Sequence, residues 1–219
     1  MIVSFPNSDH TTDSTYYISK DVGISYLPFK VGPNNSYIYQ CRISEDGHFI
    51  ALSFGVCSDV YFSKNSGESF NIIYSSSIST LYILLGMSSN GEFLYICDKN
   101  MIYIYNYSTN TLINSNNNLP VDVSLKTSYQ GISVSSRAQY LYIPIYNFDS
   151  LIYKIIKIAT YGSDTYEILS WKLEVIENQL IFNPMLKNDG TDLIGVSTNN
   201  THVYSSYDGN NHTKEGFFL

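Results

Sequence analysis

The residues that enzymes most often use for acid–base or metal chemistry are few and scattered in this 219-residue chain. Its four histidines stand in none of the spacings by which histidine pairs bind a metal ion. These are His10, His48, His202 and His212. The sequence contains no nucleophile elbow, phosphate-binding loop or dinucleotide-binding glycine pattern. We therefore expect no catalytic residues, no metal site and no cofactor.

Two pairs of neighbouring acids could in principle cleave a glycosidic bond, because that reaction needs two carboxyl groups with different protonation states. The pairs are Asp9 with Asp13 and Glu174 with Glu177. Acidic side chains are also the ordinary residues of a solvated surface, so the pairs alone do not predict an enzyme. A glycan-active hydrolase stays an alternative function.

Charge and cysteine content narrow the choice of partners and compartment. Twelve basic residues against nineteen acidic ones give a net charge of −7, which opposes binding to nucleic acid or to an anionic membrane. Three cysteines, Cys41, Cys57 and Cys97, are too few for a disulfide framework, so we expect reduced thiols. We expect no membrane span and no signal peptide, which favours the cytoplasm or a virus particle over secretion.

Two short motifs recur at a fixed distance along the chain. The octapeptide at 19–26 returns at 63–70, 44 residues later, and a weaker copy begins at Ser206. Between the copies, Asp46-Gly47 is followed after 44 residues by Asn90-Gly91. Such pairs between alternating apolar runs predict tight hairpin turns in which both central residues have positive φ.

The two motifs combine into a unit of four strands, in which the glycine pair links the first two strands and the octapeptide links the last two. Four short antiparallel strands per 40–50 residues are typical of a propeller blade. We predict an all-β, single-domain β-propeller of about five four-stranded blades. The predicted blades span about 1–32, 33–77, 78–118, 119–176 and 177–219.

Three segments of this repeat need separate treatment. The stretch 150–160 has a mixed pattern, but its β-branched residues favour a strand. Residues 2–5 align with 50–54, so the first blade lacks an innermost strand. Residues 216–219 are predicted either to fill that vacancy or to form the outer strand of the fifth blade, because an open sheet edge promotes aggregation.

The octapeptide, Ser-x-Asp/Asn-x-Gly-x-Ser/Thr-aromatic, resembles the Asp-box repeat of sialidase-type β-propellers. The matching residues are Ser19, Asp21, Gly23, Ser25 and Tyr26; Ser63, Asn65, Gly67, Ser69 and Phe70; and, in the weaker copy, Ser206 and Asp208. Their expected role is structural: the Asp or Asn accepts backbone N–H bonds, the glycine supplies positive φ, and the aromatic ring packs between blades. The resemblance implies that the boxes lie away from the functional face.

A sialidase mechanism is excluded by the arginine count. Sialidases bind the substrate carboxylate with three arginines, since each guanidinium pairs with it in bidentate fashion. This chain has only Arg42 and Arg137.

One constellation remains, at the end of the blades where second and third strands are joined. These loops carry Asp9, Asp13, Asp59, Asp98, Asp149 and His202. Clustered carboxylates would attract a cation or a basic partner, although Asp is also a common turn residue. Loops between blades are rich in Asn, Ser and Tyr, which suit contacts with protein or sugar.

We predict a non-catalytic binding or scaffold module, part of a larger assembly such as a virion. Its predicted partner is a basic protein surface or a glycan, and a lectin is the other alternative function.

Overall fold

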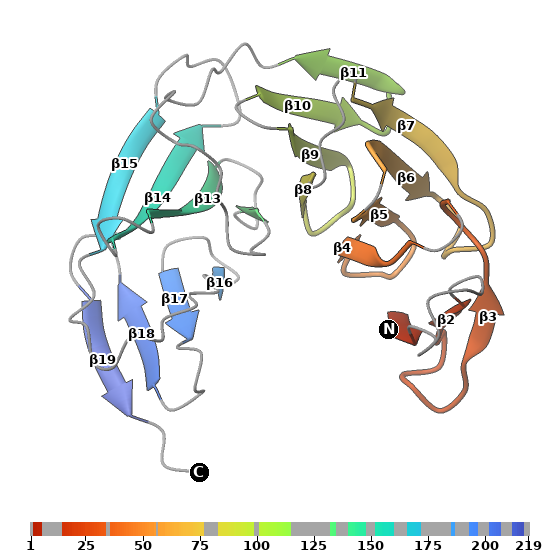
Figure 1. Ribbon diagram of the computed structural model, residues 1–219, viewed down its shortest axis with the longest axis horizontal. Helices are drawn as coiled ribbons and strands as arrows, with labels where there is room; N and C mark the ends of the chain where they lie inside the picture. Colours follow the sequence, from red (N-terminus) through yellow and green to blue (C-terminus); the bar gives the residue numbers. More distant parts are fainter. Residues whose placement is uncertain are drawn as a thin grey trace. The chain divides into compact units, whose positions relative to one another are not determined.

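Every regular element in the described part of the chain is a β-strand. The computed structural model describes residues 2–5, 15–33, 36–55, 57–76, 83–98, 101–114, 132–134, 140–147, 152–159, 166–171, 185–186, 193–196, 202–206 and 212–216. Their strands form five antiparallel sheets, and each sheet is built from strands consecutive in sequence (Figure 1). Among these residues no helix is long and apolar enough to cross a membrane.

The chain divides into two compact units, and the first contains three sheets. This unit comprises Met1–Lys99 and Tyr103–Ile113. Its first sheet has the order β1-β2-β3, with β1 (Ile2–Phe5), β2 (Thr15–Ile18) and β3 (Leu27–Phe29). The second sheet is formed by β4 (Ile38–Ile43), β5 (Ile50–Phe54), β6 (Asp59–Ser63) and β7 (Asn71–Ser75). The third consists of β8 (Leu84–Met87), β9 (Phe93–Asp98), β10 (Met101–Asn106) and β11 (Thr111–Asn114).

The second unit comprises Asn100–Ile102 and Asn114–Leu219, and it contains two four-stranded sheets. One is formed by β12 (Ser133–Val134), β13 (Tyr140–Asn147), β14 (Ile152–Ala159) and β15 (Tyr166–Trp171). The other is formed by β16 (Met185–Leu186), β17 (Leu193–Val196), β18 (His202–Ser206) and β19 (His212–Gly216).

The predicted all-β architecture of four-stranded antiparallel sheets is confirmed, and so is the short first sheet. That sheet has three strands, and β1 is an edge strand that pairs with β2. The ambiguous stretch at 150–160 contains β14, so the preference for strand was right. Gly216 ends β19 in the outer strand of the last sheet, while 217–219 lie outside the described residues. The single-domain assignment stays a prediction.

The core of the first unit lies between neighbouring sheets, and β5 shows why. All five of its residues are buried, because both faces of this strand are covered. Side chains alternate along a strand, so Ile50, Leu52 and Phe54 pack against β2 of the first sheet. Ala51 faces the other way and joins the cluster shared with β8, β9 and β10. This one strand of the second sheet thus contributes to two cores.

Candidate functional site

The first octapeptide forms a closed turn between β2 and β3, held by Asp21. Its carboxylate accepts bonds from the Ser19 hydroxyl (2.8 Å), the Ser25 backbone N–H (2.9 Å) and the Ser25 hydroxyl (2.5 Å). The Gly23 N–H donates to Ser19 Oγ at 2.6 Å, and Gly23 has φ of +90°. The bonds from Ser25, and then that from Ser19, lower the pKa of Asp21 to about 2.

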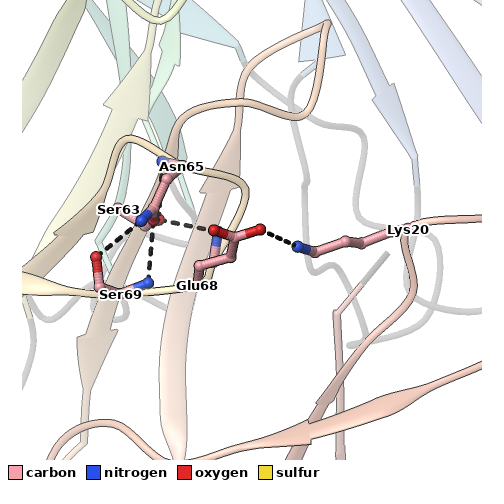
Figure 2. A network of polar contacts seen from close by, with 6 residues as sticks. Lys20, Ser63, Asn65, Glu68 and Ser69 are labelled. Atoms are coloured by element: carbon pink, nitrogen blue, oxygen red, sulfur yellow. Dashed lines mark hydrogen bonds and ion pairs between the residues drawn. The ribbon is translucent and has the colours of Figure 1, made fainter.

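The second octapeptide repeats this geometry between β6 and β7 with Asn65 in place of Asp (Figure 2). Asn65 Oδ1 accepts bonds from the Ser63 hydroxyl (2.9 Å) and the Ser69 N–H (3.0 Å). Its Nδ2 donates to Ser69 Oγ at 2.9 Å, so the amide reproduces each contact of the carboxylate. Gly67 donates to Ser63 Oγ at 2.9 Å and has φ of +82°. The predicted left-handed glycines are therefore present in both turns.

An ion pair joins the two turns, and a ring contact joins the second turn to the first sheet. Figure 2 shows Lys20 of the first turn reaching Glu68 of the second, with Nζ and Oε1 3.1 Å apart. The Phe70 ring stacks on Phe29 of the first sheet with centroids 5.7 Å apart, as predicted for the aromatic position. Tyr26, in the same position of the first turn, is 39% exposed. In the weaker copy Ser206 ends β18, and Asp208 lies outside the described residues.

The predicted two-residue hairpin turns at Asp46-Gly47 and Asn90-Gly91 are wrong. Both glycines have φ of +73°, but neither Asp46 nor Asn90 adopts positive φ. The chain instead forms a wider loop, because the Ser44 hydroxyl accepts the Phe49 N–H (2.9 Å) and Asp46 accepts the His48 N–H (2.9 Å). Side-chain acceptors thus satisfy the backbone donors that a tight turn would have paired.

The two described acids of the predicted rim lie at the same end of the second sheet but on its opposite faces. Asp59 begins β6 and accepts a bond from the Ser75 hydroxyl at 2.6 Å. Asp98 ends β9 and accepts one from the Tyr74 hydroxyl at 2.7 Å. Because consecutive strand residues point to opposite faces, Tyr74 and Ser75 hold the two carboxylates apart.

Asp98 is not an exposed rim residue, since it is only 6% accessible. Its Oδ2 is bonded to Tyr74, and its buried Oδ1 has no hydrogen-bond partner. Burial, and then the bond to Asp98, raise the pKa of Tyr74 well above its usual range. No local pattern predicts this tyrosine as a partner of Asp98, because it lies 24 residues away in a different sheet.

The remaining predicted residues do not complete a described cluster. Asp9, Asp13 and Asp149 lie outside the described residues, and His202 begins β18 in the second unit. Within the part of the chain that the structure describes, no group of three or more His, Cys, Asp or Glu could hold a metal ion. Burial raises the pKa of Cys41 to about 11 and of Cys97 to about 12, so neither is a thiolate nucleophile at neutral pH.

Searches by sequence find no relative: no protein-family model and no curated protein matches the chain. Solved structures do match. TolB from Acinetobacter baumannii aligns over 98% of this chain and 52% of its own, with a TM-score of 0.62 and 15% identity. The nidogen/laminin complex contains a chain that aligns over 99% of this chain and 78% of its own (TM-score 0.61, 10% identity). A putative TolB from Agrobacterium tumefaciens aligns over 98% and 80% (TM-score 0.55, 16% identity).

The fold is a β-propeller. This chain spans about half the length of the Acinetobacter TolB chain, and at these identities the likeness concerns the fold alone. It therefore supports the predicted architecture and leaves activity and partners to be argued from the chain's own residues.

Proposed function

We propose that this chain is a non-catalytic β-propeller of the Asp-box type that binds a protein partner. The Asp-box assignment is supported by the two octapeptide turns, which share three hydrogen bonds with matching donors and acceptors and a left-handed glycine. These polar residues are engaged within their own turns, which agrees with a structural role. The interaction role is supported by one feature of the first turn.

That feature is a stretch of exposed apolar side chains, here called the apolar turn: Val22, Ile24, Tyr26 and Leu27. Val22 is 98% exposed and Ile24 is 87% exposed. Single apolar residues at a surface need no explanation, but contiguous ones mark interaction sites. The second turn has Ser66 and Glu68 at the positions of Val22 and Ile24, so the turn itself does not require apolar residues there.

A basic partner surface agrees with the net charge of −7. Of the described rim acids, Asp59 is the one a partner could reach, since Asp98 is buried. The acidic rim as a whole stays a proposal. Glycan binding, with or without hydrolysis, is the alternative, because Asn, Ser and Tyr in the loops also suit sugars.

The test compares the wild-type chain with the double variant Val22→Ser/Ile24→Glu. This variant gives the first turn the residue types that the second turn has at the matching positions. Both are used as baits in the cells that make the protein, and both are assayed on a glycan array and a panel of chromogenic glycosides. We expect at least one protein that binds wild type and not the variant, and that binds directly once purified. Glycoside turnover, or glycan binding with identical protein partners for both baits, would refute the proposal.

A further inference from the structure

A cleft of about 380 Å³ opens between the first octapeptide turn and the hairpin loop that joins β4 to β5. Its apolar lining includes Ile18 and Val22 from the first sheet and its turn, and Ile43 and Ile50 from the second sheet. Glu45 and Asp46 of the hairpin loop supply carboxylates to the same lining. The volume lies at the lower end of the range for ligand sites, which is about 300–1,000 Å³. The cleft can therefore take one or two side chains.

Val22 lines this cleft in a backbone conformation that disfavours its residue type. Its φ is +60°, a region that is unfavourable for a β-branched residue. The matching residue of the second turn, Ser66, has nearly the same φ of +57° and a polar side chain. A serine would therefore suit the backbone at least as well as valine. An exposed valine at this position is explained by contact with another molecule.

The charges around the cleft indicate the charge of a molecule that would bind there. The one cation in the described lining, Lys20, is already paired with Glu68 at 3.1 Å. The hydroxyl of Ser44, and then the His48 N–H, lower the pKa of Asp46, so it is ionised at neutral pH. Glu45 is exposed beside it. The cleft is thus apolar with unpaired negative charge.

We propose that this cleft binds an extended segment of a partner protein in which an aliphatic side chain stands next to lysine or arginine. The inference rests on the proposed protein-binding function and names the chemistry of the partner. The aliphatic side chain covers Val22, and the basic one pairs with Glu45 or Asp46. A second copy of this chain fits poorly, because it brings the same acids and a net charge of −7. An anionic lipid surface is disfavoured for the same reason.

The chain itself supplies substitutions that leave each turn intact. Val22→Ser installs the residue of the second octapeptide, and Glu45→Ser/Asp46→Asn installs Ser89 and Asn90 of the next hairpin loop. That loop keeps the same bonds, since Asn90 Oδ1 accepts from Ser88 and from the Glu92 N–H. Ile113→Ser is the matched control, because Ile113 is 56% exposed on β11.

The probes are three labelled peptides of equal length that alternate lysine with leucine, glutamate with leucine, or lysine with serine. Their affinities for the full chain are measured by fluorescence anisotropy at two salt concentrations. We expect the lysine–leucine peptide to bind best, and to bind more weakly at high salt. Val22→Ser should weaken the affinity for this peptide about tenfold, which corresponds to the free energy gained by burying one aliphatic side chain. Glu45→Ser/Asp46→Asn should weaken it and remove the salt dependence, and Ile113→Ser should change nothing.

Thermal unfolding separates binding from folding, because Val22→Ser should melt at or above the wild-type temperature. A lower melting temperature would make Val22 structural and overturn the proposal. Equal affinity for all three peptides, or no effect of Val22→Ser, would also overturn it. Tighter binding of the glutamate–leucine peptide through Val22 would reject the basic partner while leaving the protein-binding function in place. Self-association in sedimentation equilibrium that Val22→Ser abolishes would assign the cleft to a second copy instead.

Discussion

Alanine substitutions at Gly67 and Gly47 separate backbone strain from packing in the repeated turns. Both glycines have left-handed φ, at +82° and +73°. An L-residue in that region costs about 1–2 kcal/mol. The loss of unfolded-chain entropy on replacing glycine by alanine is the same at both sites, so it cancels in the comparison.

The surroundings of the two glycines differ. A Cβ at Gly67 would lie 2.8 Å from Ile18 Cδ1 and 3.3 Å from Ile50 Cδ1, whereas a Cβ at Gly47 meets nothing within 4 Å. Both isoleucines belong to the core between the first two sheets, where an added methyl group costs about 1–3 kcal/mol. Gly67→Ala should therefore lower the free energy of unfolding by about 2–5 kcal/mol, and Gly47→Ala by about 1–2 kcal/mol.

Urea unfolding followed by tyrosine fluorescence and by circular dichroism measures both losses. Gly67→Val should lose more than Gly67→Ala, since a β-branched residue is worse at positive φ. Equal losses for the two alanine variants would show that Gly67 does not sit against the core. A Gly67→Ala variant as stable as wild type would contradict both the turn geometry and the structural role of the octapeptide.

Three further predictions concern polar side chains of the first unit. The folded state lowers the pKa of Asp21 from 3.8 to about 2, so the bonds to its carboxylate stabilise the protein above about pH 4 and are lost as the pH falls from about 4 to about 2. In pH-dependent melting, Asp21→Asn should therefore lose less stability on acidification than wild type. Tyr74→Phe removes the donor to buried Asp98 and should cost about 1–3 kcal/mol in chemical unfolding; adding Asp98→Asn should recover part of it, and no recovery would mean that the charge is not the cause. Asn65→Asp should leave the melting temperature within a few degrees of wild type, because the first turn uses Asp in the same position. Asn65→Ala should lower the melting temperature, and equal melting temperatures for the two variants would refute the shared geometry.

The class of fold and the form of the octapeptide turns follow from the amino-acid sequence alone. The 44-residue spacing and the alternating strands predict four-stranded sheets, because each repeat is one local unit. The octapeptide bonds join residues no more than four positions apart, so their residue types suffice to predict them. The wider hairpin loops show the limit even locally, since the Ser44 hydroxyl was a competing acceptor that the glycine pair alone did not reveal.

Which polar and apolar side chains remain available to a partner depends on how the sheets pack together. Asp59 and Asp98 flank the same loop of the repeat, the one between second and third strands, yet packing of one sheet against the next buries Asp98 under Tyr74. The same packing covers Gly67 with Ile18, while Val22 and its cleft stay open to solvent. These differences arise from contacts between residues many positions apart, whose free energy depends on how whole sheets pack and is not carried by the local pattern.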